Sequence, residues 1–176
     1  ELNKLERNFY TTSSCGVCGK SSIEAIKTIC RLPATNIDDL TISTEIIYAL
    51  PAILRSRQDV FDFTGGLHAC GLFDTKGNLL LTREDVGRHN ALDKLIGCAM
   101  FEDMLPLQKN ILLLSGRSSF ELIQKATMAG ITFVCAVGAP SSLAVQLSKE
   151  RRMTPIGFIR VERCTVFLGS IKFVKF

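Results

Sequence analysis

Two cysteines near the start of the sequence, Cys15 and Cys18, are the residues best suited to chemistry. They form a C-x-x-C pair in a polar stretch rich in serine, threonine and glycine, and Lys20 follows closely. The thiolate is the reactive form of cysteine, and both a nearby lysine and a following helix start lower a thiol pKa. The pattern therefore favours a reactive thiol pair over residues that fill a core.

Three other interpretations of this pair remain open. A structural zinc site needs two more ligands, and the sequence offers neither a second C-x-x-C nor an H-x-x-x-H unless a second copy completes the site. An inert pair would be expected within an apolar run. A dithiol redox module is disfavoured because no thioredoxin-like strand precedes the pair.

The composition indicates a globular protein with a substantial core. The sequence has 176 residues, of which 47% are hydrophobic, so we expect one domain over residues 21–176 and a flexible arm over residues 1–20 that carries the thiols. No apolar run is long enough to span a membrane, and residues 1–7 carry no signal-peptide pattern. The net charge of +4 is too small to indicate nucleic-acid binding.

The remaining cysteines suggest a reducing compartment. The total of seven is odd, and the five outside the C-x-x-C mostly lie within apolar patterns, as reduced core residues do. We therefore expect a cytoplasmic protein with no membrane partner.

The spacing of apolar residues predicts an α/β fold. We expect helices over 22–31, 46–54 with Pro51 as a kink, 90–100, from a Ser118–Glu121 capping box to Gly130, and 141–151. We expect strands over 69–73, 79–82, 111–114, 131–137, 156–159 and 165–168, with a loop at 64–66. This order predicts a mixed sheet with helices on both faces, a three-layer α/β/α sandwich.

Two predicted strand-to-helix turns, residues 83–90 and 115–119, could hold an anion. Each places an arginine, Arg88 or Arg117, beside the free N–H groups of a helix start. The alternative is that these arginines pair with acidic neighbours at the surface. Neither turn matches a P-loop or a G-x-G-x-x-G motif.

The sequence has two histidines, and both lie in or beside such loops. Taken singly, His68 and His89 would each be ordinary hydrogen-bonded residues. Their shared position near predicted strand ends makes both of them candidates for lining a site.

Four blocks of the sequence resemble the formate dehydrogenase accessory sulfurtransferase family, also called formate dehydrogenase accessory protein D or sulfur carrier protein. The blocks are TSSCGVCG at 12–19, TGGLHA at 64–69, EDVGRHNALDKLIG at 84–97 and SGRSSFELIQKA at 115–126. The third block is long and specific. Members of the family have a further region upstream of the C-x-x-C.

The resemblance implies sulfur transfer. Family members take sulfur as a persulfide from a cysteine desulfurase and pass it to the bis(molybdopterin guanine dinucleotide) molybdenum cofactor before its insertion into the formate dehydrogenase apoenzyme. Cys15 would then carry the persulfide and Cys18 would assist it. GDP would mimic part of the cofactor, and a homodimer could hold both nucleotide arms; no zinc is expected.

The resemblance also implies a cofactor-binding stretch near the end of the sequence. It falls on Phe158, Ile159, Arg160, Val161, Glu162 and Arg163. The other expected cofactor-binding residues are His68, Arg88, His89, Ser115, Arg117 and Ser118. The chain departs from the family where Val161-Glu162 replaces a Pro-Gly-like turn and Phe167 replaces a usual tyrosine.

The expected fold is similar to that of cytidine deaminases, but deaminase activity is not expected. Those enzymes need a glutamate beside a zinc-binding His or Cys and a P-C-x-x-C motif at the next helix. The matching helix starts carry His89-Asn90-Ala91 and Ser115-Gly116-Arg117-Ser118 instead. A non-enzymatic chaperone that binds the cofactor and moves no sulfur is the main alternative function.

Overall fold

The computed structural model describes residues 42–168. The thiols Cys15 and Cys18, Cys30 and the predicted helix 22–31 lie outside the described residues. The helices are α1 Thr44–Arg55, α2 Asp59–Thr64, α3 Arg88–Phe101, α4 Phe120–Met128 and α5 Ser142–Glu150. The strands are β1 His68–Phe73, β2 Leu79–Asp85, β3 Ile111–Leu114, β4 Phe133–Ala136, β5 Thr154–Arg160 and β6 Arg163–Val166.

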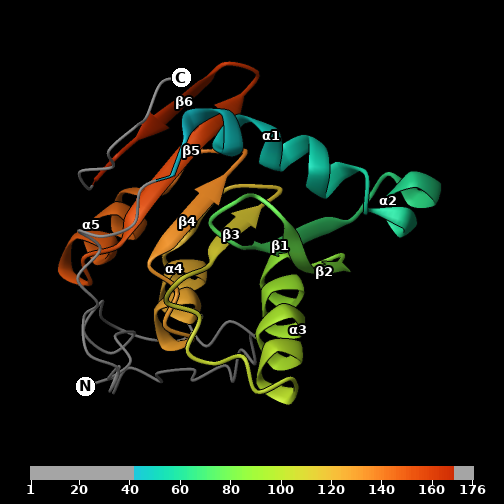
Figure 1. The fold of residues 1–176 in the computed structure, drawn as a ribbon, viewed down its shortest axis with the longest axis horizontal. Helices are drawn as coiled ribbons and strands as arrows, with labels where there is room; N and C mark the ends of the chain where they lie inside the picture. The colour runs from blue at the N-terminus through green and yellow to red at the C-terminus, as the bar shows by residue number, and fades with distance from the viewer. Residues whose placement is uncertain (1–41, 169–176) are drawn as a thin grey trace, which may run out of the picture.

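The strands form one mixed six-stranded sheet in the order β2-β1-β3-β4-β5-β6 (Figure 1). Strands β3, β4 and β5 are parallel, while β1 and β2 at one side and β6 at the other run antiparallel to their neighbours. The start of β1 therefore meets the ends of β2, β3, β4 and β5 along one edge of the sheet. We call this the site edge.

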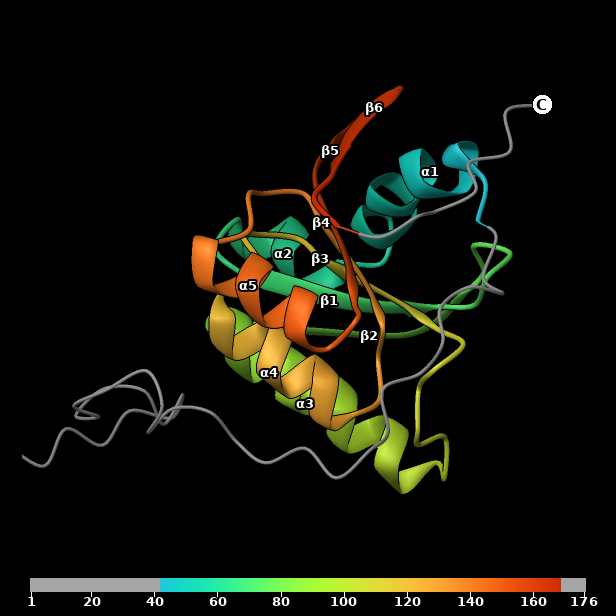
Figure 2. The same cartoon turned by 90° about the vertical axis from the view of Figure 1, so that its left-hand side faces the viewer.

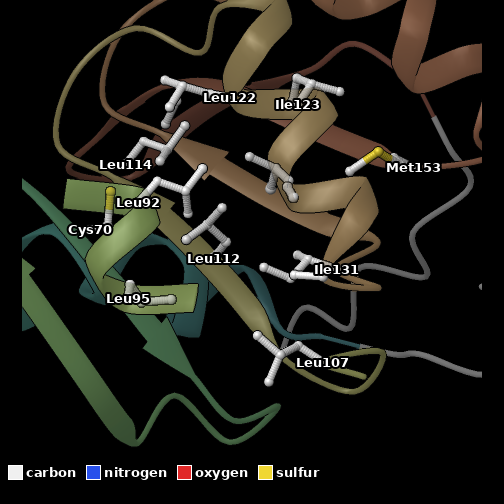
Figure 3. Close-up of a cluster of buried hydrophobic side chains, with 14 of the residues drawn as sticks. Cys70, Leu92, Leu95, Leu107, Leu112, Leu114, Leu122, Ile123, Ile131 and Met153 are labelled. Atoms are coloured by element: carbon white, nitrogen blue, oxygen red, sulfur yellow. The ribbon is translucent and has the colours of Figure 1, made fainter. Parts of the chain in front are cut away.

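Helices cover both faces of the sheet, as Figure 2 shows. Strand residues alternate between two cores, one shared with α3, α4 and α5 and the other shared with α1. Leu92 and Leu95 of α3 meet Leu112 of β3 and Leu122 and Ile123 of α4 in the first core (Figure 3). The predicted three-layer α/β/α sandwich is confirmed.

Most predicted elements are present, but several local predictions are wrong. The strand predicted at 165–168 is β6 at Arg163–Val166, two residues earlier. Residues 83–85 continue strand β2 instead of forming a turn. The predicted loop at 64–66 begins one residue too early, because Thr64 ends the unpredicted helix α2. Ser118 does not cap α4: its backbone bonds to Ala139 and Ser141, and Ser119 becomes the N-cap residue.

The β5–β6 hairpin carries a strained residue at its tip. Glu162 has φ of +59°, in the left-handed region that favours glycine. We expect Glu162→Gly to raise the free energy of unfolding by about 1 kcal/mol, because relief of this strain outweighs the added chain entropy. Val161→Gly, at a neighbouring position without positive φ, should lower it. Equal urea midpoints for Glu162→Gly and the wild type would contradict this account.

Within the described residues, no helix has both the length and the apolar composition needed to cross a membrane.

Candidate functional site

Two strand-to-helix turns interlock at the site edge. The backbone N–H of Ser118 donates to the carbonyl of Ala139 at 3.2 Å, and that of Ser141 donates to the carbonyl of Ser118 at 3.0 Å. Gly138 N–H donates to the carbonyl of Gly116, also at 3.0 Å. These bonds fix the backbone on both sides of Arg117, so its side chain projects from a rigid base.

Arg117 is exposed and forms no ion pair with any residue of 42–168. The salt bridges at this edge use other groups, so the alternative that Arg117 pairs with a surface acid finds no support in the described part of the chain. An exposed guanidinium with unused donors can bind a phosphate through two parallel hydrogen bonds.

Arg88 and Arg160 differ from Arg117 in the burial and hydrogen bonding of their guanidinium groups. The Nε atom of Arg88, at the first position of α3, is buried and has no hydrogen-bond partner among the described residues. Arg160 donates from Nη1 to the carbonyls of Val137 and Ile159, both at 2.8 Å. Arg160 therefore ties the end of β5 to the end of β4 and keeps its other nitrogens for a ligand.

A close backbone approach makes Gly138 necessary for this arrangement. A Cβ atom there would lie 2.9 Å from both the backbone nitrogen and the Cγ atom of Arg117. We expect Gly138→Ala to push the 115–119 turn aside and cost about 1–3 kcal/mol of stability, as overpacking does.

The loss of stability should appear in thermal unfolding, and calorimetry should show weaker binding of GDP. Gly97→Ala is the control, because nothing lies within 4 Å of a Cβ at that helical position. Retained GDP affinity in Gly138→Ala would show that the 115–119 turn does not contact the ligand.

His68 and Ser115 lie together where β1 starts and β3 ends. The Ala69 N–H donates to the Ser115 hydroxyl at 2.8 Å, and the Ser115 N–H donates to the Ala69 carbonyl at 3.0 Å. His68 packs against Gly116, whose Cβ, if present, would be 3.3 Å from the ring Nδ1. The structure thus brings these two predicted site residues side by side.

His89 faces α4 from the first turn of α3. Its Nε2 lies 3.2 Å from the Ser119 hydroxyl and 3.7 Å from the Glu121 carboxylate. Burial, followed by the nearby Arg88, lowers the pKa of His89. Since serine and glutamate approach the same ring nitrogen, they cannot form the relay of a hydrolase triad, in which the acid bonds the opposite nitrogen.

The Glu121 carboxylate remains ionised beside this histidine. Burial opposes its ionisation, but hydrogen bonds from Ser119 and from its own N–H, together with His89, outweigh burial and lower the pKa of Glu121. This explains why the predicted capping box does not form: Glu121 is occupied by His89 and Ser119, and Ser118 by the neighbouring turn.

The acidic residues of the EDVGRHN block support the helices around the site. Asp85 accepts hydrogen bonds from the Gly87 N–H at 2.9 Å and the Asn90 amide at 3.1 Å, and pairs with Lys94 at 2.5 Å. The hydrogen bond from Lys94, and then that from Gly87, lowers the pKa of Asp85 to about 2. Asp85 therefore stabilises the start of α3 and does not neutralise Arg88.

A pocket of about 560 Å³ opens beside this edge, between α1, α2 and the ends of β3 and β4. His68 and Ser115 line it together with Val137, and Gln58 and Phe61 form part of its opposite side. A mostly apolar wall with a few converging polar groups is typical of small-molecule sites.

A second, smaller pocket of about 300 Å³ lies on the β5–β6 hairpin. It is lined by Phe158, Arg160 and Arg163 from the predicted cofactor stretch. Phe158 has φ of +53°, is 47% exposed, and its ring centroid lies 6.3 Å from that of Phe167. Strained, half-exposed side chains of this kind are concentrated at functional sites.

The residues of the predicted cofactor-binding stretch, 158–163, do not all present their side chains to a ligand. The Ile159 side chain is 1% exposed and packs into the α1 core, so only its backbone could reach a ligand. Val161 and Glu162 are exposed at the tip of the hairpin. Ser118 is also buried, at 2% exposure, and could contribute only through its backbone.

The four described cysteines are poor sulfur nucleophiles. Cys70 and Cys135 are fully buried in β1 and β4, and burial raises their pKa values. The bond to Glu102 raises the pKa of Cys98, and burial raises that of Cys164. The described residues therefore offer no favoured sulfur nucleophile, and Cys15, Cys18 and Cys30 lie outside them.

Three contributors to the site could not be predicted from sequence spacing. Ser119 is indistinguishable from Ser118 in a helix-start pattern, and only the position of His89 decides between them. Gln58 and Phe61 belong to α2, which has no apolar periodicity. In residues 42–168, no group of three or more His, Cys, Asp or Glu side chains is arranged to hold a metal ion.

Comparison with known proteins gives a consistent result. The family model described as FdhD/NarQ matches residues 1–173. A sulfur carrier protein FdhD from Streptomyces coelicolor is 53% identical over 166 residues, which cover 94% of this chain and 59% of the relative. One from Saccharolobus solfataricus is 39% identical over 164 residues, covering 93% of this chain and 61% of the relative.

A solved structure is similar as well. A candidate formate dehydrogenase accessory protein from Desulfotalea psychrophila superposes with a TM-score of 0.70 at 27% identity, covering 77% of this chain and 58% of that protein. The chain thus spans about three fifths of the length of the curated relatives it matches. On the match over residues 1–173 and the identity to these relatives, the chain belongs to the FdhD/NarQ family.

Proposed function

We propose that this protein is a sulfur carrier that passes persulfide sulfur from a cysteine desulfurase to the bis(molybdopterin guanine dinucleotide) molybdenum cofactor, for use by formate dehydrogenase. The proposal rests on family membership and on the separation of two kinds of residue along the chain, those that could bind a ligand and those that could carry sulfur. The described residues offer a ligand site without a reactive thiol, while the C-x-x-C offers thiols in a polar segment. We place the protein in the cytoplasm and expect a homodimer.

The observation that carries the proposal is Arg117 on its rigid turn, without an ion pair to any residue of 42–168, beside a pocket lined by His68 and Ser115. A guanine nucleotide presents a diphosphate and a flat ring. Arg117 and the backbone of the interlocked turns suit the diphosphate, and the apolar pocket wall or the exposed Phe158 suits the ring. The donor set therefore fits the nucleotide part of the cofactor.

Other residues would hold the cofactor in place. Arg160 and Arg163 would contact its charged groups from the hairpin side. The Nε atom of Arg88 is buried and has no hydrogen-bond partner in the described part of the chain, and Arg88 would contribute charge near the start of α3. His89 would remain neutral near pH 7 because its pKa is lowered. The cofactor is the cargo of the reaction, and these residues bind and orient it.

The loading step is an exchange between sulfur atoms. The Cys15 thiolate attacks the outer sulfur of the persulfide on the desulfurase, forming a new S–S bond while the desulfurase cysteine leaves as a thiolate. Cys18 would assist Cys15, for example by accepting sulfur or releasing it. The four described thiols are disfavoured as competitors, since their pKa values are raised.

The mass of the protein tests this step. The full-length protein is incubated with a cysteine desulfurase and cysteine, and its intact mass and peptides are measured. We expect a gain of one sulfur atom on the peptide that contains Cys15 and Cys18. A protein that binds GDP and gains no sulfur would instead be the chaperone alternative. A reversible Cys15–Cys18 disulfide without sulfur gain would indicate a redox module.

A further inference from the structure

Helix α2 forms one wall of the pocket at the site edge but is weakly anchored. Phe61 in α2, its N-cap residue Gln58 and the following Gly65-Gly66 all line the pocket. None of the six residues of α2 is buried, and Phe63 is 91% exposed. Figure 1 shows α2 projecting beyond the end of α1. Its position must therefore depend on a few specific polar contacts.

The strongest of these contacts comes from Glu84 in strand β2. Its two carboxylate oxygens accept hydrogen bonds from the backbone N–H groups of Val60 and Phe61, each at 3.0 Å. These N–H groups belong to the first turn of α2 and have no partner within the helix. Because Gln58 makes no side-chain capping bond, Glu84 supplies the cap from 24 positions away in the sequence.

The other contacts of α2 are weaker. Arg55 pairs with Asp62 at 2.6 Å and lies over the Phe61 ring at 4.6 Å, but the Arg55 and Asp62 side chains are 49% and 59% exposed. Exposed ion pairs contribute little to stability. At the far end, Gly65 adopts φ of +65° and leads directly into the loop before β1. The helix is thus held firmly at its first turn only.

We propose that Glu84 is a positioning residue that fixes α2 as a wall of the ligand pocket and so sets the affinity for the nucleotide. This inference rests on the proposed function, in which the pocket serves the nucleotide. Without the two bonds, α2 also occupies positions in which Gln58 and Phe61 no longer line the pocket. Apparent affinity then falls in proportion to the fraction of molecules that keep the binding arrangement.

The 5% exposure of Gln58 shows what this positioning achieves. Gln58 lines the pocket immediately before α2 begins, so its place in the wall depends on where the first turn of α2 is held. Glu84 therefore acts on the ligand through Gln58 and Phe61, without touching it.

The test uses three variants of the full-length protein: Glu84→Ala, Glu84→Gln and, as control, Glu102→Ala near the opposite end of α3. GDP binding is measured by calorimetry, and exchange of the Val60 and Phe61 amides by hydrogen–deuterium exchange. We expect Glu84→Ala to weaken GDP binding about tenfold and to speed exchange of both amides, while α1 amides are unchanged. Glu84→Gln keeps one acceptor oxygen and should lie between Glu84→Ala and the wild type.

Several outcomes separate this inference from the proposed function. If the wild type binds GDP and Glu84→Ala binds it equally well, the positioning role is wrong and the proposed function stands. If the wild type does not bind GDP, the proposed ligand is wrong, and the exchange data alone then decide whether Glu84 fixes α2. If Glu84→Ala does not fold, Glu84→Gln becomes the test. A partial loss of GDP affinity with faster exchange of the Val60 and Phe61 amides would support the proposal, and unchanged affinity and exchange in Glu84→Gln would overturn it.

Discussion

Replacing Cys15 by alanine is expected to abolish sulfur loading while leaving the affinity for GDP unchanged. The four described cysteines are poor substitutes, because burial or hydrogen bonding raises the pKa of each of them and disfavours the thiolate. The proposed nucleotide site is built from residues of 42–168, which the substitution does not alter. Loading is measured by intact mass after incubation with desulfurase and cysteine, and GDP affinity by calorimetry.

Cys98→Ala is the matched control, since Cys98 is partly exposed and hydrogen-bonded between Arg83 and Glu102. It should load sulfur as the wild type does. Loss of GDP binding in Cys15→Ala would show that the thiol segment is part of the nucleotide site, and the separation of roles would then be wrong. Normal sulfur loading in Cys15→Ala would show that another cysteine carries the sulfur.

Replacing Arg117 by alanine is expected to weaken GDP binding by about ten- to a hundredfold, the equivalent of one or two charge-assisted hydrogen bonds. Arg117 is exposed and has no ion pair to lose within residues 42–168, so the free energy of unfolding should hardly change. Calorimetry and thermal unfolding of the same preparation measure the two effects.

Lys109→Ala provides the matched control for Arg117→Ala. Lys109 is an exposed cation that precedes β3, at the opposite end of the strand that leads to Arg117. Its removal changes the net charge equally and should leave GDP affinity intact. Equal losses in the two variants would mean that GDP senses only overall charge, and no loss in Arg117→Ala would remove this residue from the site.

The layered fold follows from the sequence because burial imposes clear periodicity. Leu92 and Leu95 of α3 and the unbroken apolar run of β3 each face a core, and their spacing reveals the element. The parallel strands place both predicted arginine turns at one edge, and His68 and Ser115 line the same pocket there. Local boundaries are less accurate, as the extension of β2 through Asp85 shows.

The missed elements depend on contacts between distant parts of the chain. Helix α2 has no buried face, so no pattern of apolar residues predicts it, and its N-terminal cap is Glu84 on another strand. The capping box at Ser118 satisfies a local rule, but His89 and the β4–α5 turn offer Glu121 and Ser118 stronger partners. The pocket wall formed by Gln58 and Phe61 consequently could not be predicted from spacing.

The central claim is that sulfur held by the C-x-x-C moves to a cofactor bound at the site edge. The most direct test loads the protein with sulfur, removes the desulfurase, adds the molybdenum cofactor and follows the mass of the peptide that contains Cys15. We predict that this peptide loses its extra sulfur atom when the cofactor is present and keeps it in buffer or with GDP alone. Retention of the sulfur while the cofactor is bound would contradict the account.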